Sequence, residues 1–227
     1  MVRGLMGRVC SSSWRWRVAI VCWYADATEL ADAGRFGRGM DSLPWPERRD
    51  KVMRFRFEKD RRLCLAGGLV VAHALRSWGV RDLAMSFGEF DKPRLAHEEG
   101  VHFNLSHAGI YCVCAVADEP VGVDVEERQR MDEGVARICF QEQERAWLYS
   151  QEDPGWAFTR LWTRKEAYLK LLGTGLSREA ASFAALPGDE RELGVSFFES
   201  ELTGHALSVC SRMAQPVTLE RLDLTVL

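Results

Sequence analysis

Two acidic residues stand two positions apart near the middle of the chain, in the segment Gly122-Val123-Asp124-Val125-Glu126. If this segment is a strand, Asp124 and Glu126 project from one face while the valines face the core. Neighbouring carboxylates repel each other unless a cation lies between them, and Mg²⁺ is commonly held by one or two carboxylates together with substrate phosphates. By itself the pattern is more typical of a solvated strand face, so a metal site needs further support.

A helix predicted over residues 155–172 carries a second pair of charged side chains. Glu166 and Lys170 are four residues apart, so they lie one above the other on the helix surface. Such a pair is ordinarily a surface ion pair worth about 0.3–0.5 kcal/mol. The functional interpretation gives the two residues separate tasks. Glu166 completes a metal site or accepts a proton, and Lys170 meets negative charge that develops on a phosphate.

A third candidate is the segment Asn104-Leu105-Ser106-His107. A serine beside a histidine is found in hydrolases, but adjacent side chains of an extended segment point apart, and the Gly-x-Ser-x-Gly signature is missing from the sequence. We therefore expect Ser106 and His107 to contact phosphate. The alternative for His107 is a hydrogen-bonded structural histidine.

The elements that would position these residues occur in two similar groups, before and after about Asp118. The first group has a strand at 15–23, an irregular segment with at most one helical turn at 26–46, a charged segment at 47–62 and a helix at 61–77. Gly67 and Gly68 either weaken that helix or mark a close packing contact. A strand pair follows at 111–117 and 121–126. Helices are predicted at 131–149 and 155–172, then strands at 195–200, 205–211 and 217–222.

The composition is that of an ordinary globular protein. The 227 residues are 47% apolar and carry a net charge of −3, which does not indicate a dedicated nucleic-acid binder, and no apolar run is long enough to span a membrane. Seven cysteines without metal-type spacing suggest reduced thiols. Residues 1–14 contain arginine and serine but no acid. They form either a disordered tail of a cytoplasmic protein or a presequence for a mitochondrion or another organelle.

Taken in order, these segments resemble the two-domain 4′-phosphopantetheinyl transferases, the type that activates peptide and fatty-acid synthases. That family has a basic segment, Gly-Lys-Pro, Asn-x-Ser-His, Gly-Ile/Val-Asp-x-Glu, Trp-x-x-Lys-Glu-x-x-x-Lys and Gly-x-Gly-Leu. The matching segments here are Pro46-Glu47-Arg48-Arg49-Asp50-Lys51, Asp91-Lys92-Pro93, Asn104 to His107, Gly122 to Glu126, Trp162-Thr163-Arg164-Lys165-Glu166-Ala167-Tyr168-Leu169-Lys170 and Gly173-Thr174-Gly175-Leu176. Two positions depart from the pattern: Asp91 replaces the usual glycine, and Ala108 replaces a polar residue.

The resemblance implies an α+β fold, built as a pseudo-two-fold pair of similar halves with coenzyme A in the cleft between them. Residues 15–117 would form the coenzyme A-binding half, and residues 118–227 the half with Mg²⁺ and the catalytic groups. Such a pseudo-dimer is expected to be a monomer. The implied reaction moves the 4′-phosphopantetheine group of coenzyme A to a serine of an apo acyl carrier protein or carrier domain and releases 3′,5′-ADP. The alternative is a non-catalytic coenzyme A-binding regulator with the same fold. Neither interpretation calls for a nucleic-acid or membrane partner.

The resemblance also assigns roles to residues. Asp124, Glu126 and Glu166 would hold Mg²⁺, and Glu166 would also act as the general base, directly or through water. Lys170 would stabilise or protonate the leaving phosphate, so the expected catalytic set is Glu166, Lys170, Asp124 and His107. The expected coenzyme A contacts are Arg48 and Lys51 for the 3′-phosphate, Lys92 and Pro93 on the nucleotide side, together with Arg62 (or its neighbour Arg61), Asn104, Ser106, His107 and Lys170.

Overall fold

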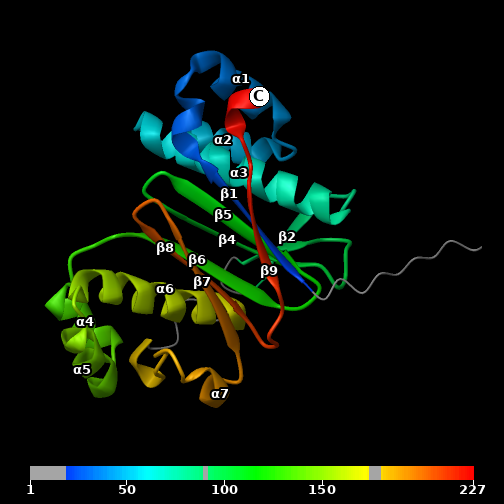
Figure 1. Ribbon diagram of the computed structural model, residues 1–227. Helices are drawn as coiled ribbons and strands as arrows, with labels where there is room; N and C mark the ends of the chain where they lie inside the picture. Colours follow the sequence, from blue (N-terminus) through cyan, green and yellow to red (C-terminus); the bar gives the residue numbers. More distant parts are fainter. Residues whose placement is uncertain (1–18, 89–91, 174–179) are drawn as a thin grey trace, which may run out of the picture.

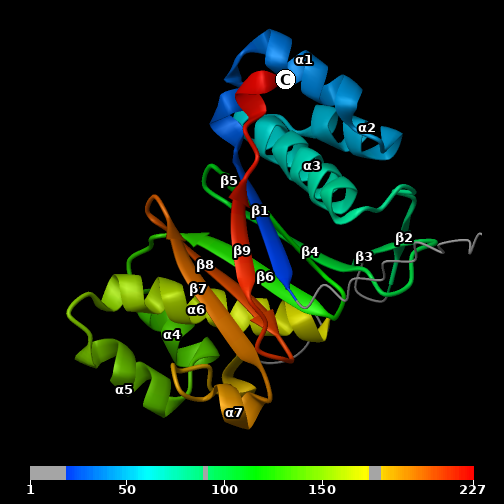
Figure 2. The same cartoon turned by 45° about the vertical axis from the view of Figure 1, so that its right-hand side comes forward.

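The computed structural model describes residues 19–88, 92–173 and 180–227. Its larger sheet has the strand order β4–β5–β1–β9, and a second sheet has the order β6–β8–β7 (Figures 1 and 2). The strands of these two sheets are β1 (Ile20–Asp26), β4 (His102–Ala108), β5 (Tyr111–Ala117), β6 (Val121–Glu127), β7 (Ser196–Leu202), β8 (His205–Ser211) and β9 (Val217–Arg221).

The helices are α1 (Ala33–Ser42), α2 (Pro46–Arg54), α3 (Glu58–Trp78), α4 (Glu133–Cys139), α5 (Glu142–Ser150), α6 (Pro154–Leu172) and the short α7 (Glu190–Leu193). A small hairpin of β2 (Met85–Phe87) and β3 (Pro93–Leu95) follows α3. Short 3₁₀ turns occupy Ala27–Ala31, Ala180–Ser182 and Leu224–Val226.

The molecule consists of two similar halves. In the first half, β1 is followed by the long helix α3 and then by the paired strands β4 and β5. In the second half, β6 is followed by α6 and the paired strands β7 and β8. The strand order also repeats, because β4–β5–β1 corresponds to β7–β8–β6. The predicted α+β fold with two similar halves is therefore confirmed.

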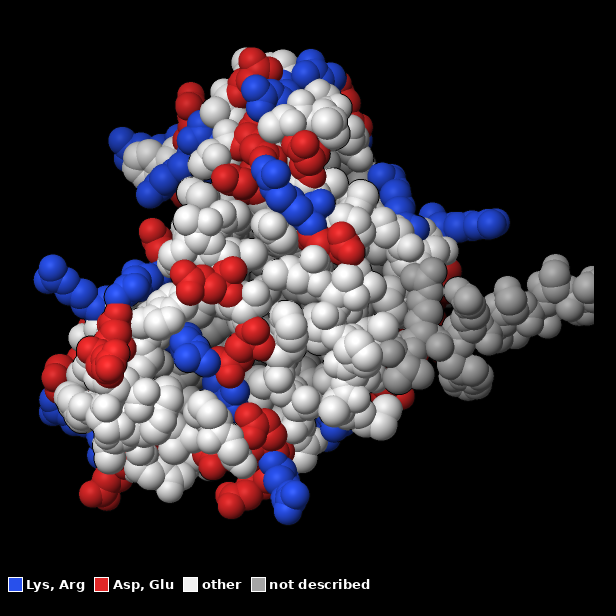
Figure 3. All heavy atoms as spheres, in the orientation of Figure 1, with Lys and Arg blue, Asp and Glu red and all other residues white. Residues whose placement is uncertain are grey.

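The halves stack as four layers, with α3 and α6 on the outside and the two sheets between them (Figure 1). The inner faces of the sheets share one apolar cluster, in which Cys22 and Ala115 of the first sheet meet Val123 and Val125 of the second. Asp124 lies between those two valines on the opposite face of β6, toward α6. The predicted alternation of this strand is thus confirmed. Charged side chains of both signs are interspersed on the face shown in Figure 3.

The predicted pairing of 111–117 with 121–126 is wrong. These segments are strands, but β5 pairs with β4 and β1, whereas β6 pairs with β8 in the other sheet. The turn at 118–120 passes from one sheet to the other. Its short length suggested a hairpin, but each strand buries its apolar face in the cluster between the sheets.

Two helical predictions also need correction. Residues 26–46 contain the ten-residue helix α1, which begins where the Asp32 side chain accepts a hydrogen bond from the Arg35 amide. The single helix predicted at 131–149 is two helices, α4 and α5, which are separated at Phe140 and Gln141. Gly67 and Gly68 do not interrupt α3, and Arg48 packs against them, so they mark a close contact.

The chain returns to its first half at the end. Strand β9, which was predicted as part of the second half, pairs in parallel with β1, and Leu224 joins the apolar core of the first half. The division near residue 118 otherwise stays a prediction. The six cysteines in the described part form no disulfide, as expected for free thiols. No described helix is long and apolar enough to cross a membrane.

Candidate active site at the seam between the halves

The candidate site lies where β4 of the first half runs beside β6 of the second. The amide of Val123 donates a hydrogen bond to Asn104 Oδ1 (2.9 Å), and Ser106 Oγ donates to Asp124 Oδ1 (2.7 Å). Asn104, predicted as a coenzyme A contact, is thus buried and holds the two strands together. Two of the three sequence candidates, the Asn-x-Ser-His segment and the acidic strand, meet at this seam.

The third candidate segment reaches the seam through Lys170. Its Nζ lies 2.5 Å from Asp124 Oδ1 and donates to Ser106 Oγ at 2.7 Å. Ser106, Asp124 and Lys170 therefore form a triangle of hydrogen bonds that joins β4, β6 and α6. In the described part of the chain, the ion-pair partner of Lys170 is Asp124. The ordinary surface pair with Glu166, four residues earlier, does not form.

Asp124 is only 3% exposed, and its second oxygen, Oδ2, is buried without a hydrogen-bond partner among the described residues. Burial raises the pKa of this carboxyl, although Lys170 and Ser106 oppose the rise. Burial, followed by the Asp124 charge, raises the pKa of Glu126 to about 7 and also raises the pKa of Glu166. Three carboxyl groups thus influence one another, with the Lys170 ammonium lowering the pKa of each.

The donor chemistry of this cluster fits a hard divalent cation. It offers carboxylate oxygens, including the buried Asp124 Oδ2, which has no hydrogen-bond partner among the described residues. The raised pKa of Glu126 shows that the cluster has too little positive charge nearby to favour its ionised form. The carboxylates of this cluster are not arranged as a preformed metal site. Among the described segments, no three histidine, cysteine, aspartate or glutamate residues form a metal-binding group. Asp124 Oδ1 is instead occupied by Lys170 and Ser106.

Next to the seam, Arg48 and Lys51 of α2 line a pocket of about 300 Å³ whose other walls include the apolar side chains of Pro93, Phe103 and Leu105. The Arg48 guanidinium lies over α3, where it donates to the carbonyl of Cys64 (3.2 Å). Partial loss of hydration lowers the pKa of His107, and the positive charges of Lys170, Arg48 and Lys51 lower it further. His107 thus lies near enough to Lys170 and to the two cations of this pocket for their charges to lower its pKa.

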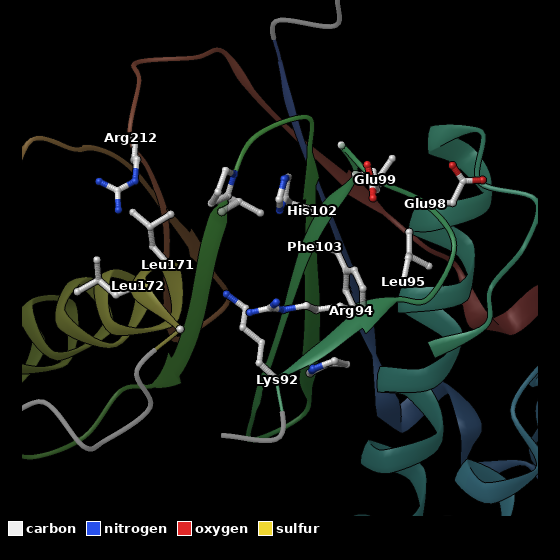
Figure 4. Close-up of a pocket in the computed structure, with 16 residues that line it drawn as sticks. Lys92, Arg94, Leu95, Glu98, Glu99, His102, Phe103, Leu171, Leu172 and Arg212 are labelled. Carbon is white, nitrogen blue, oxygen red and sulfur yellow. The ribbon is translucent and has the colours of Figure 1, made fainter. Parts of the chain in front are cut away.

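A larger cavity of about 530 Å³ lies on the other side of Pro93, between the β2–β3 hairpin, the start of β6 and the end of α6. Lys92 and Arg94 point into it, and Arg212 lies across from them (Figure 4). Lys92 Nζ donates to the carbonyl of Lys170 (2.6 Å), so the hairpin is tied directly to the catalytic candidate. Burial, followed by the Arg94 charge, lowers the pKa of Lys92.

Comparison with known proteins shows the family to which the chain belongs. Residues 120–220 match the 4′-phosphopantetheinyl transferase superfamily, and residues 35–119 match the N-terminal part of 4′-phosphopantetheinyl transferases. The chain is 32% identical over 194 residues to the 4′-phosphopantetheinyl transferase psf-1 of Bacillus pumilus, covering 78% of this chain and 82% of that protein. The chain belongs to the 4′-phosphopantetheinyl transferase superfamily.

Other members of the superfamily are similar over comparable lengths. The 4′-phosphopantetheinyl transferase Sfp of Bacillus subtilis strain 168 is 28% identical over 182 residues, which cover 73% of this chain and 81% of Sfp. The transferase HetI of Nostoc sp. strain PCC 7120 is 34% identical over 155 residues, which cover 63% of this chain and 65% of HetI.

Some residues that the superfamily resemblance suggested do not reach the seam. Arg61 and Arg62 line a separate pocket of about 220 Å³ with Phe36 of α1 and Met53 of α2. Arg62 is 3.9 Å from Glu58, and Arg61 donates to the carbonyl of Phe55 at 2.8 Å. Neither arginine borders the pocket of Arg48 and Lys51. Asp91 and residues 174–176 of the Gly-x-Gly-Leu segment lie outside the described residues.

Our sequence analysis gave no role to Gly122, although it is part of the superfamily's acidic-strand motif. A side-chain Cβ at this position would lie 2.5 Å from the backbone nitrogen of Leu171 and closer still to the carbonyl oxygen of Ala167. Only glycine lets α6 approach β6 so closely, which is how Lys170 reaches Asp124. A glycine inside a strand is itself a signal of close backbone approach.

Proposed function

We propose that this protein transfers the 4′-phosphopantetheine group of coenzyme A to a serine of an apo acyl carrier protein or carrier domain, releasing 3′,5′-ADP. The observation that carries the proposal is the triangle of Ser106, Asp124 and Lys170. It brings groups from both halves of the fold together beside a cationic pocket, where a pyrophosphate and its nucleotide can be bound. The family relationship supports the same chemistry.

In the proposed reaction, the carrier serine oxygen attacks the phosphorus that bears the pantetheine arm. A new oxygen–phosphorus bond forms, the bond to the bridging oxygen breaks, and that oxygen leaves with 3′,5′-ADP. Glu166 accepts the serine proton, directly or through water. A neighbouring cation would lower the pKa of this carboxylate and make it a weaker base, so its part in the proton transfer depends on its position beside the serine hydroxyl. Lys170 turns from Asp124 to the leaving phosphate, whose growing charge it offsets.

Asp124, Glu126 and Glu166 are the residues that would hold Mg²⁺. When bound, the ion neutralises charge on the pyrophosphate and lowers the pKa of the attacking hydroxyl. Arg48 and Lys51 bind the 3′-phosphate, for which the planar guanidinium of Arg48 is well suited. Ser106 and His107 contact the remaining phosphates, and Lys92 and Pro93 line the nucleotide side.

The decisive experiment incubates the protein with labelled coenzyme A, Mg²⁺ and a panel of apo-carriers from fatty-acid, polyketide, peptide-synthetase and lysine-pathway systems. We expect at least one carrier to gain the labelled arm on its serine, and a chelator to prevent the transfer. Transfer must also be lost for a carrier in which that serine is replaced by alanine.

The second candidate function, a non-catalytic coenzyme A-binding regulator, predicts a different outcome. Such a protein binds coenzyme A in a calorimeter but labels none of the carriers. The presence of all three carboxylates together with Lys170 favours the transferase, because a regulator needs no general base and no group aimed at the leaving phosphate.

A further inference from the structure

The cations Arg164 and Lys165 precede Glu166 on α6 and have no part in the proposed reaction. At about 100° of helix rotation per residue, Arg164 points away from Glu166, and Lys165 lies about 140° from Lys170. Both side chains are almost fully buried. A buried charge is strongly unfavourable unless it is paired and hydrogen-bonded, so the groups that satisfy these two cations must be held firmly.

Lys165 is surrounded by acceptors. Its Nζ donates to the carbonyls of Ala180 (2.7 Å) and Phe183 (2.6 Å) and lies 2.8 Å from Glu144 Oε2. Those three contacts use all three ammonium protons. Glu144 is also fully buried, and its other oxygen accepts from the amide of Ala185 (2.9 Å). The Lys165–Glu144 pair therefore joins α6, α5 and the segment 180–185.

Arg164 holds the continuation of the same segment. Its guanidinium donates to the carbonyls of Ala185 (2.6 Å) and Leu186 (3.1 Å), and it pairs with Glu190 and Glu199, each at 2.7 Å. Together the two cations bind four carbonyls between residues 180 and 186. This segment, which we call the 180–186 clamp, follows the chain's exit from α6, shortly after Lys170.

We propose that Lys165 is a positioning residue, which acts through the 180–186 clamp and Glu144 to fix the rotation of α6 so that Glu166 and Lys170 face Asp124. The opposite side of the helix is held by the backbone contact at Gly122. With one side pressed against β6 and the other tied to the clamp, α6 has little freedom to turn about its axis. The inference rests on the proposed function, since Glu166 and Lys170 are the groups being positioned.

The test compares variants that loosen the clamp, and the main variant removes both members of the buried ion pair so that neither charge is left unpaired. Lys165→Met alone would strand the Glu144 carboxylate, so the main variant is the double substitution Lys165→Met with Glu144→Gln, which keeps similar volumes. Glu144→Gln alone retains the two carbonyl contacts of Lys165 and is the milder step. Arg160→Met is the matched control, because Arg160 also lies on α6 and pairs with Glu199 (3.0 Å), and no hydrogen bond or ion pair among the described residues joins it directly to the clamp. Glu199 keeps its ion pair with Arg164 in this variant.

For the double variant, measured well below its melting temperature, we expect kcat to fall about 10- to 100-fold while the KM for coenzyme A stays within about twofold. Amide hydrogen exchange should become faster at residues 180–186 and at 166–172. Glu144→Gln should give a smaller fall in kcat. Arg160→Met should change neither kcat nor the exchange rates. A structural role alone would lower the melting temperature and leave the kcat of the folded molecules unchanged.

Two results would overturn the inference. The first is a double variant whose 180–186 exchange is faster while its kcat and its exchange at 166–172 match the wild type. The second is unchanged exchange at 180–186, which would show that Lys165 does not hold the clamp. If the double variant does not fold, Glu144→Gln decides between the same outcomes. A wild-type protein that labels no carrier would refute the proposed function instead, and the exchange comparison would still test the positioning.

Discussion

The two oxygens of the Asp124 side chain have different surroundings. One of its oxygens binds both Ser106 and Lys170, and the other is buried without a partner in the described structure. Glu126 and Glu166 lie close enough for its charge to raise their pKa values. Asp124 thus has one paired and one unpaired oxygen, and the predictions for Glu166 and Glu126 concern the carboxyl groups around it.

Glu166→Ala is expected to abolish transfer, because the carrier serine then has no group to accept its proton and the carboxylate cluster loses a member. Glu166 makes no ion pair among the described residues, so the fold should be retained. Transfer to the best carrier and the thermal unfolding curve should be measured together. Wild-type-like transfer by this variant would contradict the role given to Glu166.

The raised pKa of Glu126 predicts how stability depends on pH in the chelator-treated protein. Between the ordinary glutamate value of 4.5 and the folded-state value of about 7, the folded protein retains a proton that the unfolded chain has lost. The free energy of unfolding must therefore fall as pH rises through this window. Melting temperatures from pH 4.5 to 8 should show that fall, and Glu126→Gln should make it shallower. An equal slope in both proteins would argue against the shift.

Lys51→Ala tests the nucleotide side of the site. Loss of its charge from the pocket beside Arg48 should raise the KM for coenzyme A more than it lowers kcat, because the 3′-phosphate is remote from the reacting phosphorus. The measurement compares coenzyme A with desphospho-coenzyme A, which has no 3′-phosphate. The substitution should change the kinetics with coenzyme A but not with desphospho-coenzyme A. If the variant had wild-type kinetics with both substrates, Lys51 would not bind the 3′-phosphate.

At the scale of elements, the approach of α6 to β6 at Gly122 decides whether the site forms. Gly122→Ala places a methyl group against the backbone of Ala167 and Leu171, so we expect a loss of about 3 kcal/mol or more in the free energy of unfolding, and little transfer. Urea unfolding measures the first effect.

Gly37→Ala is the matched control for this substitution. Gly37 lies inside α1, where an added Cβ would meet nothing within 4 Å. Alanine there should stabilise the protein by about 0.5–1 kcal/mol, because glycine is the weaker helix former. If both substitutions had the same small effect, the close contact at Gly122 would not govern the position of α6.

The elements also show how far the sequence could be interpreted. The alternation Val123-Asp124-Val125 predicted both faces of β6, and the order of motifs predicted the family. Helix α1 was missed because its three glycines obscure the helical pattern and its start depends on one cap at Asp32. The separation of β5 from β6 was missed because a short turn looks the same whether it closes a hairpin or crosses between sheets. Lys165 was taken as part of a motif, and its burial depends on distant residues such as Glu144.

At the scale of the whole molecule, the two halves are interlocked by the last described residues. The amide of Leu222 donates to the carbonyl of Tyr24 (2.8 Å), and the amide of Leu224 donates to Glu29 Oε2 (2.8 Å). Arg221 pairs with the same glutamate. Because Leu224 is buried in the first core, these residues complete the half in which the chain begins.

Deleting residues 216–227 should therefore damage the first half more than the second. The deletion exposes the edge of β1 and empties the place of Leu224, so amide exchange should become much faster in α1 and α3 than in α6. A lower melting temperature and loss of transfer should accompany the change. Uniform exchange across both halves would indicate that β9 does not support the first half selectively.

The return of β9 to β1 has a consequence for how the protein is made. On a ribosome the first sheet cannot be completed in step with its synthesis, since its parallel edge strand emerges after every residue of the second half. The strands and helices between residues 121 and 211 have their own sheet and core, and they can fold while β1 still awaits its neighbour. The nascent chain would thus acquire its acidic strand and helix before the first sheet gains its edge strand β9.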